Sequence, residues 1–298
     1  MFMADKRNQN LMQLVKRLHG LVDNTDLNKQ RQSQDYIGTI FGNSKEVVYK
    51  PVDVGGMEGE WISPNRPYMK EHVILYCHGG GYSTGSPVYA RTITNKLADS
   101  TSMDVFCFDY RLAPENPYPA ALEDALKAWD YLMLKGYGAR DVIVAGDSAG
   151  GNLALALTLK LKEEGRFLPR GLILMSPWTD LTASGKSYET RAAADPVLDK
   201  DYMDRVVTAY ADGHDLENPL ISPLFADFKG FPPTYIQVGD NEILLSDSKR
   251  LYQNLLRDNV SAHIEVFKGM WHVFQMAPFR TANEAMDKNA EFIFEICR

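Results

Sequence analysis

Short apolar runs alternate along the chain with longer stretches whose apolar positions recur at helical spacing. The short runs predict buried strands at residues 73–77, 105–108, 142–145, 172–175, 235–238 and 264–267. The longer stretches predict helices near residues 88–100, 120–135, 150–164, 247–258 and 281–296. This order is typical of an α/β fold, in which helices cover both faces of a mostly parallel sheet.

One of these helices has an ambiguous pattern. Leucines occupy every second position from Leu153 to Leu161, which by itself would predict a strand. The positions between them hold Ala and Lys among others, and Leu, Ala and Lys all favour helix. Charges accumulate only after Thr158. We therefore expect a buried helix that reaches solvent at Lys160.

Two stretches do not follow the alternation. Residues 1–45 are mostly helical by pattern, and residues from about 180 to 225 contain a helix candidate at 199–211. Open α/β sheets bind ligands at the carboxyl ends of their strands. We expect both stretches to form a cap over that edge, with residues 46–298 as the main domain. A stripe at helical spacing in the first stretch predicts a helix that packs on its own protein: Leu11, Leu14, Val15, Leu18 and Val22.

Composition narrows the choice of function. The chain has 298 residues, 45% of them hydrophobic, and a formal charge of −7, which argues against a nucleic-acid partner. No stretch approaches the ~20 apolar residues needed for stable membrane insertion, and no signal peptide is recognisable. Cys77, Cys107 and Cys297 have neither a disulfide pattern nor metal-type spacing. We expect a cytoplasmic protein without a metal site.

Two glycine motifs carry chemistry. Gly146-Asp147-Ser148-Ala149-Gly150 lies between a predicted strand and a predicted helix and fits a nucleophile elbow, a tight turn that exposes a reactive serine. Upstream, His78-Gly79-Gly80-Gly81 follows another strand. Glycines there let backbone N–H groups approach the negative oxygen of a tetrahedral intermediate. Ser148 is therefore predicted as a nucleophile, with an oxyanion hole that begins at Gly79, and His78 is expected to be structural.

The base and the acid must come later in the chain, because this fold orders its triad as Ser, acid, His. His272 follows the strand that ends at residue 267, where a base is expected. The acid is less defined, because the strand before it is followed by three carboxylates: Asp240, Glu242 and Asp247. Either residue type can orient an imidazole, so the pattern leaves the choice open.

From about residue 45 to 295 the chain resembles the hormone-sensitive-lipase-like branch of microbial esterases and lipases, often called bacterial family IV. The similarity rests on the two glycine motifs and on three further segments: Asp109 to Glu115, Ser176-Pro177-Trp178-Thr179-Asp180, and Gly269 to His272. The resemblance implies an α/β-hydrolase core of about eight strands, a helical cap, no cofactor, and hydrolysis of small carboxylic esters. Residues 46–298 would then form the catalytic domain, with a cap insertion at about 180–225.

The resemblance also implies roles for single residues. Gly79, Gly80 and Ala149 would supply the N–H groups of the oxyanion hole. The D-P-x-x-D type of segment that usually carries the family's triad acid is absent. Aligning the residues that follow, Asp247-Ser248, with the family's pattern places Glu242 at the position of the acid. Asp240 is the second candidate and Asp247 the third. Bulky residues indicate a small pocket for short acyl groups: Tyr82, Tyr202, Met203, Tyr210 and Phe225.

Other readings of the same pattern remain. A deacetylase or amidase could use the same triad. Plant gibberellin receptors resemble this branch and bind a small ligand without catalysis, but they lack the catalytic His that stands here at 272. Many relatives form a homodimer through an edge strand, and a homodimer is an alternative to a monomer for this chain.

Overall fold

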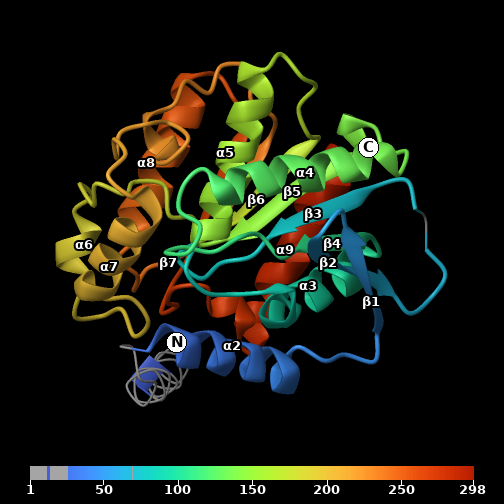
Figure 1. Ribbon diagram of the computed structural model, residues 1–298, viewed down its shortest axis with the longest axis horizontal. Coiled ribbons are helices and arrows are strands. Elements are labelled where there is room, and N and C mark those ends of the chain that lie inside the picture. The colour runs from blue at the N-terminus through green and yellow to red at the C-terminus, as the bar shows by residue number, and fades with distance from the viewer. Residues whose placement is uncertain (1–11, 14–25, 69) are drawn as a thin grey trace.

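The computed structural model describes residues 12–13, 26–68 and 70–298 (Figure 1). The strands are β1 (Val47–Val54), β2 (Met57–Pro64), β3 (Val73–Cys77), β4 (Asp104–Phe108), β5 (Val142–Asp147), β6 (Gly171–Met175), β7 (Thr234–Gly239) and β8 (Ala262–Phe267). The helices are α2 (Leu27–Phe41), α3 (Pro87–Thr101), α4 (Ala120–Leu134), α5 (Ala149–Glu163), α6 (Ser187–Thr190), α7 (Lys200–Ala211), α8 (Leu245–Arg257) and α9 (Arg280–Ile296). Short 3-10 helices lie at Ala139–Asp141, Pro223–Phe225 and Phe274–Met276.

The strands form one eight-stranded sheet in the order β1-β2-β4-β3-β5-β6-β7-β8. The pairs β1–β2 and β2–β4 are antiparallel, and all the others are parallel. The expected α/β-hydrolase architecture is confirmed, and the six predicted strands are present. The leucine-rich segment after Ser148 is the helix α5, as its composition indicated.

The sequence did not reveal β1 and β2. Only the two ends of β1, Val47 and Val54, are buried, because this strand lies at the edge of the sheet, so no apolar run marks it. β2 carries a buried charge at Glu60, which forms a two-point ion pair with Arg91 of α3. The other strands were predicted from continuous apolar runs. β1 lacks such a run because it is exposed at the edge, and β2 lacks one because it contains a paired carboxylate.

Side chains of the central strands alternate between two apolar cores. Val73 and Leu75 of β3 pack with residues of α4, α5 and α8, whereas Ile74 and Tyr76 pack with residues of α3 and α9. This follows from the two-residue repeat of a strand. Figure 1 shows α4 and α5 on one side of the sheet and α3 and α9 on the other. Because β3 is buried on both faces, its sequence is apolar throughout.

Two segments outside the alternation lie beside the loop that follows β3. Arg31 of α2 donates to the carbonyl of Ser83 at 2.9 Å and pairs with Glu115 at 2.7 Å. α7 begins at the N-cap Asp199, as predicted, and its Tyr202 lies next to Gly81. The expected apolar stripe (Leu11, Leu14, Val15, Leu18 and Val22) lies outside the described residues. No helix in the described ranges is long and apolar enough to cross a membrane.

α5 packs unusually closely against the end of β3. A Cβ atom added to Gly150 would lie 2.0 Å from the carbonyl oxygen of Cys77, and one added to Gly146 would lie 2.3 Å from the carbonyl oxygen of Gly150. Both obstacles are backbone atoms, which cannot move aside as a flexible side chain would. The first turn of α5 can reach this position only if both residues are glycine.

Substituting alanine at Gly150 should therefore lower the free energy of unfolding by about 1–3 kcal/mol or more, the usual cost of forcing extra atoms into a packed interior. Urea denaturation measures this change. Gly138 is the matched control, since its φ of −78° suits alanine and the nearest atom is a movable side-chain oxygen of Asp141. Equal stability of Gly150→Ala and Gly138→Ala would contradict the close-packing argument.

Candidate active site

Ser148 sits in the turn between β5 and α5, with φ 53° and ψ −120°. This backbone conformation is strained for a residue other than glycine. Hydrogen bonds on both sides hold it: the N–H of Ser148 donates to the carbonyl of Met175 at 2.9 Å, and its carbonyl accepts from Trp178 N at 3.0 Å. Both partners come from the end of β6 and the residues just after it. The neighbouring strand therefore maintains the strained turn and the exposure of the hydroxyl above the sheet.

The structure brings three of the predicted side chains into one line. His272 Nε2 lies 2.9 Å from Ser148 Oγ, and His272 Nδ1 lies 3.0 Å from Glu242 Oε2. These residues follow β5, β7 and β8, three parallel strands whose carboxyl ends meet at one edge of the sheet. Glu242 is fully buried and His272 is 6% exposed. The contacts are thus formed out of bulk water.

Ser176 holds the other oxygen of Glu242. The Ser176 hydroxyl donates to Glu242 Oε1 at 2.9 Å and accepts from Val273 N at 3.1 Å, so one side chain links the loops of the acid and the histidine. Gly239 N donates to the same Oε1 at 2.6 Å. Sequence reasoning gave Ser176 no role, although it begins a motif shared with the family. Its positive φ of 50° was not visible in the sequence.

Only one of the three candidate carboxylates reaches the imidazole. Asp240 Oδ1 accepts from Gly269 N at 2.6 Å and ties two loops together. Asp247 is buried one turn further along and accepts from Thr179 N and from the next backbone N–H, both at 2.9 Å. Glu242 is the one that contacts His272. The geometry therefore favours the carboxylate that the family register indicated.

Two opposing effects act on the pKa of His272. Burial lowers it, because the charged ring loses its hydration. The hydrogen bond and charge of Glu242, together with the charges of Asp195 and Asp147, raise it more than burial lowers it. The net result is a pKa above the usual 6.5. The site is thus arranged to stabilise a positive charge on the imidazole.

The glycine loop differs from expectation at its first position. Gly79 N donates to Asp147 Oδ1 at 3.0 Å, and Tyr76 donates its hydroxyl to the same oxygen at 2.6 Å. The Gly79 N–H is therefore directed at a carboxylate, which is inconsistent with the predicted role as an oxyanion donor. Gly80 and Gly81 line the cavity beside Ser148.

His78 has the structural role that was expected. Its ring is fully buried and stacks on Tyr110, with ring centroids 4.0 Å apart. Its Nδ1 lies 2.8 Å from the carbonyl of Gly79. Burial lowers the pKa of His78 to about 4, so the ring is neutral at physiological pH. A neutral stacked ring here fixes the start of the glycine loop.

A cavity of about 370 Å³ opens in front of Ser148 and His272. α2 contributes Ile37 and Phe41 to its wall, and the chain before and within α7 contributes Leu198 and Tyr202. The wall therefore combines segments from the two stretches that were expected to form a cap. Within the described residues, no group of three or more His, Cys, Asp or Glu side chains is placed to hold a metal ion.

Of the predicted pocket residues, Tyr202 lines this cavity. Tyr82 instead stacks on Tyr210, with ring centroids 3.7 Å apart, and both side chains are buried. Met203 lies on the buried side of α7 and packs in the apolar core. Phe225 is 37% exposed and borders a separate surface depression beside α8. Bulk alone did not distinguish packing residues from cavity residues.

Comparison with known proteins gives a consistent picture. The α/β-hydrolase fold family matches residues 74–276. An esterase of Acinetobacter venetianus is 38% identical over 89% of this chain and 88% of its own length. An acetyl-hydrolase of Streptomyces hygroscopicus is 37% identical over 84% and 83% of the two chains.

Solved structures agree with these relatives. A hormone-sensitive lipase from a metagenome library superimposes with a TM-score of 0.93 at 35% identity, over 98% of each chain. An esterase of the bacterial hormone-sensitive lipase family gives a TM-score of 0.91 at 32% identity, over 96% of each chain. The similarity thus extends over the whole fold. The chain belongs to the hormone-sensitive-lipase-like branch of the α/β-hydrolase family, and it is a carboxylic ester hydrolase.

Proposed function

We propose that Ser148 is the nucleophile of this serine carboxylesterase, that His272 is its general base, and that Glu242 orients and stabilises His272. The support is the continuous pair of hydrogen bonds from Ser148 through His272 to Glu242, at 2.9 and 3.0 Å. His272 Nε2 takes the Ser148 proton as the hydroxyl attacks the ester carbonyl. The same imidazole then protonates the leaving alcohol, and afterwards it activates the water that hydrolyses the acyl-enzyme.

The oxyanion that forms during attack needs backbone donors already in place. We assign this role to Gly80, Gly81 and Ala149, replacing the expected Gly79, whose N–H is directed at Asp147. Ala149 is the first residue of α5, where the helix dipole favours a negative charge. One such donor contributes about 2.7–4 kcal/mol to transition-state stabilisation in comparable sites.

Residues of the two cap stretches form much of the cavity wall, and we infer that α2 and the 187–211 region act as a substrate-binding cap. A cavity of about 370 Å³ lies near the lower end for small-molecule sites. We propose short acyl esters as substrates, in line with the acetyl-hydrolase among the relatives. The deacetylase or amidase alternative is not favoured, because both the Acinetobacter venetianus relative and the family's solved structure are esterases.

We further propose a cytoplasmic location and no nucleic-acid partner. Cys77, Cys107 and Cys297 are free thiols, which suits a reducing compartment. The charge of −7 opposes binding to phosphate backbones. A homodimer is proposed through an edge strand of the sheet, β1 or β8, because edge strands offer unpaired backbone groups to a second chain.

Glu242→Gln should lower kcat by on the order of 1,000- to 10,000-fold towards p-nitrophenyl butyrate, because an amide does not hold the working tautomer and charge of His272. Steady-state kinetics measure this effect. Asp240→Asn is the matched control: it alters a neighbouring carboxylate that bonds Gly269, and its effect should be far smaller. A larger loss in the Asp240 variant would transfer the role of the acid to Asp240.

Among p-nitrophenyl esters, kcat/KM should peak at short acyl chains and fall steeply towards palmitate. Each methylene gains about 0.8 kcal/mol only while there is apolar space to bury it. Ile37→Trp should move the optimum to shorter chains, because Ile37 lines the cavity. Tyr36→Trp, on the exposed side of the same helix, should leave the optimum unchanged. A rate that continues to rise up to palmitate would refute the short-chain assignment.

A further inference from the structure

The turn that carries Glu242 is attached to residues 187–198, which comprise α6 and most of the chain between α6 and α7. Asp195 makes the central contact: its Oδ2 accepts from Ile243 N, the residue after Glu242, at 2.9 Å. Its Oδ1 accepts from Val197 N at 2.9 Å and from Leu198 N at 3.0 Å. Val197 and Leu198 line the cavity. One carboxylate therefore bonds both the acid-bearing turn and the cavity wall.

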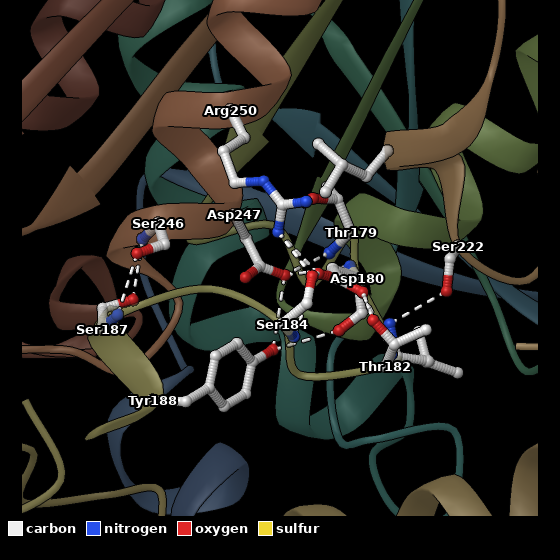
Figure 2. A network of polar contacts seen from close by, with 12 residues as sticks. Thr179, Asp180, Thr182, Ser184, Ser187, Tyr188, Ser222, Ser246, Asp247 and Arg250 are labelled. Carbon is white, nitrogen blue, oxygen red and sulfur yellow. Dashed lines mark hydrogen bonds and ion pairs between the residues drawn. The ribbon is translucent and has the colours of Figure 1, made fainter. Parts of the chain in front are cut away.

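A second contact holds the other end of the same turn. Ser187 and Ser246 exchange two hydrogen bonds, from Ser246 N to Ser187 Oγ at 2.8 Å and from Ser187 N to Ser246 Oγ at 2.9 Å (Figure 2). The Ser187 hydroxyl also donates to the carbonyl of Ile243. These bonds join neutral groups. They show that the turn can be fastened to this segment without a charged side chain.

Beneath this end of the turn lies a buried acidic pair, Asp180 and Asp247. Figure 2 shows Arg250 reaching Asp180, while Asp247 accepts the N–H groups of Thr179 and Asp180. Burial and the charge of Asp180 raise the pKa of Asp247 well above its usual value. This network anchors the start of α8, and its residues are not among the largest influences on the pKa of His272.

Asp195 differs from these anchors because its charge acts on His272. It is 4% exposed, and burial raises its pKa to about 6, while the positive charge available on His272 opposes that rise. Its carboxylate in turn raises the pKa of His272, together with Glu242 and Asp147. Burying a carboxylate costs free energy unless hydrogen bonds or an opposite charge offset it. Three N–H donors and the positive charge available on His272 do so for Asp195.

We propose that Asp195 is a positioning residue for the ester hydrolysis, one that holds the Glu242 turn and stabilises the imidazolium of His272. When Ser148 attacks the ester, its proton moves to His272, and the positive ring is stabilised by nearby buried carboxylates. Glu242 contacts the ring directly, whereas Asp195 acts through its charge and through its hydrogen bond to Ile243 N. The proposal rests on the proposed roles of Ser148, His272 and Glu242.

Asp195→Asn removes the charge and places an NH₂ group against at least one of the N–H donors. We expect kcat towards p-nitrophenyl butyrate to fall roughly 10- to 100-fold, as is usual when a reacting group is slightly misplaced, with KM within about threefold of the wild-type value. The acidic limb of the kcat/KM profile should also move to lower pH by roughly half a unit, because His272 loses a neighbouring negative charge.

Two controls separate charge from structure. Ser187→Ala loosens the same turn without removing a charge, so its acidic limb should coincide with that of the wild type. Asp130→Asn removes an exposed α4 carboxylate that pairs with Arg166, outside the proposed cap and the cavity wall, and it should alter neither kcat nor the limb. If Asp195→Asn does not fold, Asp195→Ser serves instead, because a serine hydroxyl can still accept the local N–H groups. Thermal unfolding shows which variant is folded.

An unshifted acidic limb in the folded Asp195 variant, or an equal shift in Ser187→Ala, would overturn the proposal. So would an unchanged kcat. These results would leave the proposed function intact if Glu242→Gln still abolishes turnover. If Glu242→Gln also kept a kcat close to that of the wild type, the triad assignment would be wrong. The role of Asp195, which depends on that assignment, would then fail with it.

Discussion

The site depends on how closely α5 approaches the end of β3. Gly150 and the carbonyl of Cys77 leave no room for a Cβ atom, and Gly146 meets the same limit inside the turn. Between these two glycines, in the strand-to-helix turn, Ser148 has a positive φ of 53°. Its hydroxyl then stands above the sheet, and Ala149 N begins the helix at the same place. The proposed nucleophile and the proposed oxyanion donor Ala149 N therefore lie side by side in a turn that only small residues allow.

Three negatively charged side chains near that turn act on the imidazole of His272. Glu242 in the loop after β7 contacts it, and the charges of Asp195 before α7 and of Asp147 at the end of β5 act on it as well. Each carboxylate is buried and accepts a backbone N–H group, which for Asp195 and Asp147 comes from a different loop. Hydrogen bonds thus keep charged groups in a poorly hydrated place, where their effect on a proton transfer is strongest. Asp195 accepts hydrogen bonds both from the turn that carries Glu242 and from the chain that lines the cavity.

The sequence could predict features that are written locally. Apolar runs marked the six strands from β3 to β8, and the glycines around Ser148 marked the strand-to-helix turn that holds the proposed nucleophile. Features set by tertiary contacts were not predictable: β1 is an exposed edge strand, and Ser176 and Asp195 have roles only because distant loops meet there. The Gly79 assignment was wrong for the same reason, since its N–H direction depends on Asp147. Pocket residues chosen by bulk alone included core packing residues.

The central claim is that the hydroxyl of Ser148, activated by His272, forms a covalent bond to the substrate acyl group. The most direct test is reaction with a fluorophosphonate, followed by intact-mass measurement and mapping of the modified peptide. The account predicts one adduct for each chain, located on Ser148, which forms more slowly as acid protonates His272 and is lost in His272→Ala. An adduct on another residue, or labelling of Ser148 at an undiminished rate without His272, would contradict it.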